Sequence, residues 1–92
     1  MPVDELLSRL KEIEDLIRVP GLIGHSASAR SLAMSIARQA PTEGVANLAM
    51  QLTAAVDALE EHELPLSTSN IDLSKTLWRL RLALEREKKG DS

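Results

Sequence analysis

The chain contains no cysteine, no phenylalanine, no tyrosine and a single tryptophan, Trp78. Without cysteine it cannot form a disulfide, a thiol nucleophile or a zinc–thiolate site. No window approaches the ~18 consecutive apolar residues that a membrane-spanning helix needs, and the N-terminus lacks the apolar core of a signal peptide. The four glycines are scattered, so no glycine-rich phosphate-binding loop is present. We therefore expect a cytoplasmic protein with no cofactor.

The residues that are abundant favour helices. Leucine, alanine and charged residues dominate the 92 positions, and residues typical of strands are sparse. A chain of this length forms one domain and buries only about 60–65% of its unfolded surface. The composition predicts a single all-α domain spanning residues 1–92, for which an uncovered apolar face would be costly.

Apolar residues recur every three or four positions in four segments, which predicts helices at about 3–19, 26–40, 42–63 and 69–88. Proline-containing loops at about 20–25, 40–42 and 64–69 separate them. Ser69, with Asp72 three residues later, is predicted to cap the last helix. Net charge alternates in sign from segment to segment, as neighbours in an antiparallel bundle would favour. The expected architecture is an up-down four-helix bundle.

One face of each predicted helix is apolar and is expected to form the core. These stripes are Val3, Leu6, Leu10, Ile13 and Ile17; Ala29, Leu32, Ala33, Ile36 and Ala40; Val45, Leu48, Leu52, Val56 and Leu59; and Leu73, Leu77, Leu80 and Leu84. The second helix contributes mostly small residues, so it should pack close to its neighbours.

The last helix carries a second apolar stripe. Ile71, Trp78 and Leu82 lie ~180° from its leucines. We interpret this stripe as a subunit or partner interface, because tryptophan is a favoured anchor at such contacts. The predicted interface residues are Ile71, Trp78, Leu82, Arg79, Arg81, Met50 and Ala54. The alternative is burial within the monomer, under Leu22 and Ile23 or under residues 64–68.

The two histidines do not form recognisable sites. Phosphorelay domains place the reactive histidine within a helix, followed by a basic and a small residue. His25 opens a predicted helix, and of the two only the small residue, Ala29, has a counterpart. His62 lies in an acidic cluster, but Leu59 stands where the Glu-x-x-His motif of di-iron bundles needs glutamate. We expect the cluster to be a solvated helix end, frayed or paired with Arg30 or Arg38, and we expect no metal.

Other chemistries are weakly supported. The break at Pro41 gives residues 31–48 the rhythm of a helix-turn-helix, but residues 42–64 contain no lysine or arginine to read bases. The net charge of −3 also argues against nucleic acid. Glu85 and Glu87 break the cationic face that would suit a membrane surface. No serine lies in a Gly-x-Ser-x-Gly turn, so an enzyme is not expected.

Two functional classes remain. The first is a non-enzymatic protein–protein interaction module: a small adaptor, a regulator or an assembly subunit. Its partner would be a second copy of the chain, forming a homodimer through the last helix, or another protein. The second class is a small DNA-binding or phosphorelay-type regulatory domain.

Overall fold

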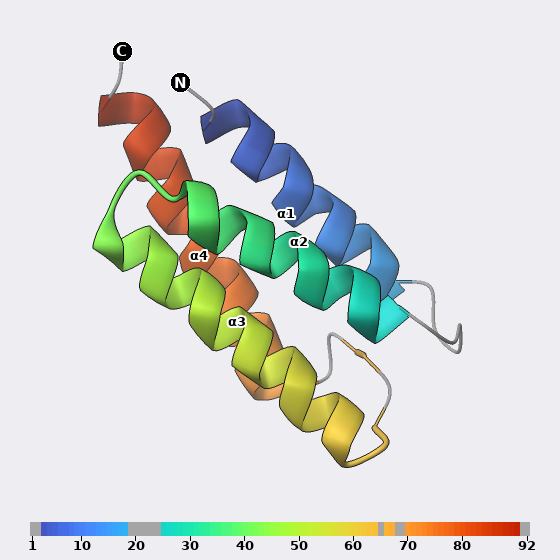
Figure 1. The fold of residues 1–92 in the computed structure, drawn as a ribbon. Helices are drawn as coiled ribbons and strands as arrows, with labels where there is room; N and C mark the ends of the chain where they lie inside the picture. The colour runs from blue at the N-terminus through green and yellow to red at the C-terminus, as the bar shows by residue number, and fades with distance from the viewer. Residues whose placement is uncertain (1–2, 19–24, 65, 68–69, 91–92) are drawn as a thin grey trace.

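A computed structural model describes residues 3–18, 25–64, 66–67 and 70–90. It contains helices α1 (Val3–Arg18), α2 (His25–Gln39), α3 (Glu43–Glu61) and α4 (Ile71–Gly90), as Figure 1 shows. No strand occurs in these described ranges. The predicted all-α class and its four helices are therefore confirmed. Of the predicted loop at about 20–25, residues 20–24 lie outside the described residues and His25 is the first residue of α2.

Seen along the bundle axis, the four helices lie at the corners of a square. Each helix packs against two neighbours, in the order α1–α2, α2–α3, α3–α4 and α4–α1, whereas the described backbones of the diagonal pairs α1–α3 and α2–α4 lie farther apart. Successive helices run in opposite directions, so the α1 and α4 ends nearest the two termini lie together (Figure 1). The bundle measures 41 × 21 × 20 Å. This is the predicted antiparallel up-down arrangement.

The core consists of the predicted stripes, with small differences at their edges. Leu6, Leu10, Ile13, Leu52 and Leu80 are fully buried. In α2, Ala29 and Ala33 are also fully buried and let that helix approach its neighbours closely. In α3 Ala49 is also fully buried, although it was not among the predicted core residues, while the predicted core residue Leu48 is half-buried at the margin. Ala49 belongs to the core because it lies in line with Val45, Leu52 and Val56 at helical spacing.

Two helix starts show how local residues set the element bounds. The Thr42 hydroxyl accepts a hydrogen bond from the Val45 amide at 3.2 Å, as an N-cap does. At α4 the cap is Asn70, whose side-chain oxygen accepts from the Leu73 amide at 2.9 Å. Ser69 was predicted as the cap of this helix, one residue before the cap that the structure uses, and α4 begins at Ile71. Ser69 itself lies outside the described residues.

The end of α3 is closed by a Schellman motif, a pair of hydrogen bonds that satisfies the last carbonyls of a helix. The Leu64 amide donates to the Leu59 carbonyl at 2.8 Å, and the Glu63 amide donates to the Glu60 carbonyl at 3.1 Å. Glu63 adopts a left-handed backbone conformation with φ 56° to make this turn. The chain then enters the connection to α4, where Leu66 is buried in the core.

A candidate interaction face on the last helix

Helix α4 has one buried and one exposed apolar face. Its four stripe leucines are buried, with at most 8% of their surface accessible. On the opposite side, Ile71 is 68% exposed and Trp78 is 63% exposed, and Leu82 is half-buried. The linker residue Leu66 packs into the core instead of over this face, and Leu22 and Ile23 lie outside the described residues. The monomer therefore leaves Ile71 and Trp78 accessible.

On the α1 side, Trp78 borders an open hollow of about 250 Å³. The hollow is lined by Glu14, Arg18, Ser74, Leu77, Trp78 and Arg81. Arg81 donates a hydrogen bond to the Glu14 carboxylate and forms an ion pair with it. Arg81, predicted as part of the interface rim, is thus engaged with α1, because Glu14 is brought beside it by the packing of α1 on α4.

On the α3 side, α4 borders a second open groove. Its lining residues are Leu48, Arg79, Leu82, Ala83 and Arg86. Leu48, Leu82 and Ala83 are half-buried and form its apolar part, whereas Arg79 and Arg86 are exposed. The predicted rim residue Arg79 therefore lies beside Leu82 as expected, but toward α3.

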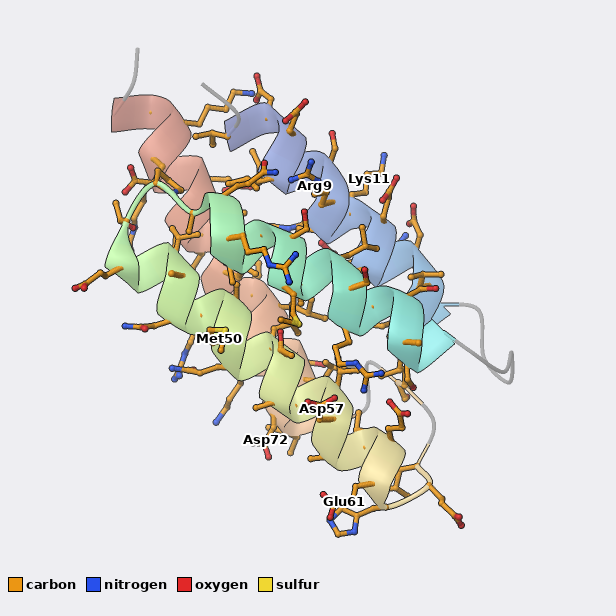
Figure 2. All side chains as sticks on the ribbon, viewed as in Figure 1. Arg9, Lys11, Met50, Asp57, Glu61 and Asp72 are labelled. Carbon is orange, nitrogen blue, oxygen red and sulfur yellow. The ribbon has the colours of Figure 1, made fainter. Side chains whose placement is uncertain are left out.

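The two predicted interface residues on α3 lie outside both of these grooves. Met50 is 54% exposed and Ala54 is exposed. Figure 2 shows Met50 midway along the outer side of α3. The exposed apolar residues thus include a main stripe on α4, a smaller patch of Met50 and Ala54 on α3, and Leu64 beyond the end of α3.

Ion pairs tie specific helix pairs together. Arg30 of α2 donates to Asp57 at 2.7 Å and to Glu60 at 2.9 Å on α3. The hydrogen bond to Asp57, followed by the charge of Glu60, raises the pKa of Arg30 above its ordinary value. The acidic end of α3 is therefore paired with α2 through Arg30, one of the two partners expected from the sequence.

The remaining cross-helix contacts involve α1. Lys88 of α4 pairs with Asp4 at 2.9 Å, and Arg9 donates to the Gln39 side chain of α2 at 2.8 Å. Among the described side chains, no ion pair or hydrogen bond crosses from α3 to α4. The described packing between α3 and α4 is therefore mainly apolar.

The two histidines lie at helix ends. His62 is the C-cap of α3 and is exposed, beside a hollow that Asn70 and Asp72 also line. His25 opens α2, as expected from the sequence. Within the described residues, no group of three or more histidine, aspartate or glutamate side chains is placed to hold a metal ion. No described helix combines the length and apolarity of a membrane span.

Comparisons with protein-family models, with curated protein sequences and with solved structures found no match. Ile71 and Trp78 lie outward, as the spacing predicted, and Leu82 is half-buried beside them. Lys75 was not among the predicted interface residues, although it flanks that stripe on the α3 side. Its spacing from Arg79 was a usable signal, because positions 75, 79 and 86 share one side of a helix.

Proposed function

We propose that this protein is a non-enzymatic protein–protein interaction module, acting in the cytoplasm as an adaptor, regulator or assembly subunit. Its contact surface is the outward stripe of α4, made by Ile71, Trp78 and Leu82. The proposed partner is a second copy of the chain, giving a homodimer. The observation that carries the proposal is the 63% exposure of Trp78.

The exposed tryptophan supports this proposal energetically. A tryptophan side chain buries about 150–250 Å² when it is covered, so roughly 100–150 Å² of Trp78 is still available for contact. At about 25 cal/mol per Å² its burial is worth about 2.5–4 kcal/mol. A two-fold contact uses each residue twice. Together with Ile71 and Leu82, this gain can offset part of the ~4–15 kcal/mol that association costs.

Absolute mass in solution tests the proposal. Light scattering after size exclusion, across a concentration series, should give twice the chain mass of 10.1 kDa. Trp78→Ala and Leu82→Glu should each return the mass to that of one chain, with the helical circular dichroism unchanged. Leu64→Ala is the matched control, because Leu64 is 51% exposed but lies beyond the end of α3. A wild-type chain that stays monomeric at every concentration would refute self-association.

A further inference from the structure

A row of cations runs along the side of α4 that faces α3. Lys75, Arg79 and Arg86 lie at positions i, i+4 and i+11, with Leu82 at i+7, so they share one side of the helix. All three cations are exposed, and Arg79 and Arg86 line the α3–α4 groove beside Leu82 and Ala83. We refer to Lys75, Arg79 and Arg86 as the cationic flank.

The cationic flank is not paired with any described residue. None of its three residues forms an ion pair or a side-chain hydrogen bond with a described residue. On the opposite side of α4, by contrast, Arg81 and Lys88 are both paired with acids of α1. The positive charge on α4 that has no described partner is therefore concentrated on one side, next to an apolar groove. An exposed acid, Asp72, lies at the N-terminal end of that side, three residues before Lys75.

The α3 side of the groove offers no charge of either sign at its centre. Leu48 lines the groove, and Gln51 and Ala55 follow it at spacings of three and seven, on the same side of α3. The acids Asp57 and Glu60 are held by Arg30 on the α2 side. The groove thus combines an apolar floor with positive charge along one edge only.

We propose that the α3–α4 groove binds an amphipathic helix of another protein that carries acidic residues beside its apolar face. Apolar side chains of that helix contact Leu48, Leu82 and Ala83, and its carboxylates pair with the cationic flank. A helix laid into a hydrophobic groove, read through anchors at helical spacing, is an established mode of peptide recognition. Charge complementarity of this kind gives specificity and speeds association.

Two other occupants fit the groove less well. A second copy bound groove to groove about a two-fold axis would bring Arg79 and Arg86 against their own counterparts, and like charges so placed are repulsive. An anionic membrane would also meet α3, which carries exposed Glu43 and Glu61 and no lysine or arginine. A narrow acidic helix meets only the cationic edge and the apolar floor.

This inference extends the proposed interaction function but does not require self-association. The α3–α4 groove and the outward stripe of α4 share Leu82. A helix bound in the groove would therefore compete with a second copy of the chain bound on the outward stripe. Trp78 itself does not line the groove. The Trp78→Ala variant therefore separates the two ideas: it should lose self-association and keep binding in the groove.

The probe is a fluorescein-labelled synthetic helical peptide with leucine at i, i+4, i+7 and i+11 and glutamate on both flanks. A peptide with lysine in place of each glutamate is its counterpart. Fluorescence anisotropy at low salt should show binding of the glutamate peptide to wild type and to Trp78→Ala, weakened by added salt. The lysine peptide should bind at least about tenfold more weakly.

Charge reversal on the protein completes the test. Arg79→Glu with Arg86→Glu should weaken binding of the glutamate peptide by at least about tenfold. The matched control, Lys11→Glu with Arg38→Glu, makes the same change in net charge at exposed cations of α1 and α2 and should change binding by less than about threefold. Circular dichroism of each variant verifies that the helices remain.

Several results would overturn the proposal. These are no binding of the glutamate peptide, equal binding of both peptides, or equal weakening by the control variant, which would indicate only long-range attraction. Binding to phosphatidylserine vesicles without binding to the peptide would assign the cationic flank to a membrane surface instead. If Trp78→Ala lost peptide binding and Arg79→Glu with Arg86→Glu kept it, the peptide would lie on the outward stripe of α4 and not in the groove.

Discussion

Glu63 is the residue at which a single change should stabilise the bundle. It occupies the left-handed position of the Schellman motif that ends α3, with φ 56°. Glycine is the preferred residue there, because a Cβ atom in this conformation clashes with the neighbouring carbonyl. Glu63→Gly keeps both hydrogen bonds of the motif while removing that clash. We therefore expect the variant to be more stable than wild type.

The size of the gain follows from two opposing terms. The left-handed conformation costs an L-residue about 1–2 kcal/mol, and glycine relieves this cost. Glycine also adds about 0.5–1 kcal/mol of conformational entropy to the unfolded chain, which opposes the gain. The net stabilisation is about 0.5–1 kcal/mol, which raises Tm by about 2–8 °C in a domain of this size.

Glu63→Ala separates conformation from charge. Both substitutions remove a carboxylate from the C-terminal end of α3, where the helix dipole disfavours negative charge, but only glycine removes the Cβ atom. Urea unfolding followed by circular dichroism should therefore place Glu63→Gly about 0.5–1 kcal/mol above Glu63→Ala. All three proteins must be measured at one concentration, because any self-association shifts the midpoint. Equal stability of the two variants would refute the conformational argument.

Three further predictions concern the fold. Leu80→Ala, at a fully buried position of α4, should lower the free energy of unfolding by about 2–5 kcal/mol in urea titrations, and a loss below 1 kcal/mol would contradict its place in the core. Asn70→Ala removes the acceptor of the Leu73 amide and should cost about 1 kcal/mol, whereas Asn70→Asp should retain most of the stability. Arg30→Ala breaks two exposed ion pairs and should lower the urea midpoint only slightly, by an amount that shrinks when the titration is repeated in high salt.

The helices could be predicted from the sequence because their information is local. Leucine and isoleucine at spacings of three and four predict which side of α1 and α4 faces inward, and prolines at positions 20 and 41 of the sequence predict where the first two helices end. The start of α4 was misplaced because Ser69 and Asn70 are both good cap residues, and Asp72 three positions after Ser69 resembles a capping box. The structure instead uses the Asn70 side chain, which is in register with the Leu73 amide.

The site was predictable in part for the same reason. The angle between Trp78 and the leucines of α4 is a property of one helix, so the outward stripe follows from spacing alone. Whether an arginine forms an ion pair does not depend on its sequence neighbours alone. Arg81 is paired with a residue 67 positions away in the sequence, while Arg79, two positions earlier, has no described partner. Which arginine remains available for a partner depends on the acids of the neighbouring helix, and that requires the packed bundle.

The charge on α4 is left unmatched because of where α3 directs its acids. Residues 42–64 are strongly acidic and contain no lysine or arginine, yet Asp57 and Glu60 turn toward Arg30 on α2. The alternating net charge of the four segments therefore favours antiparallel neighbours in general without pairing every seam. The α1–α4 and α2–α3 seams are bridged by ion pairs, and the α3–α4 seam is held by apolar contacts. No described ion pair of the bundle involves the cationic flank. Reversing the charges of Arg79 and Arg86 is therefore expected to change binding with little effect on folding.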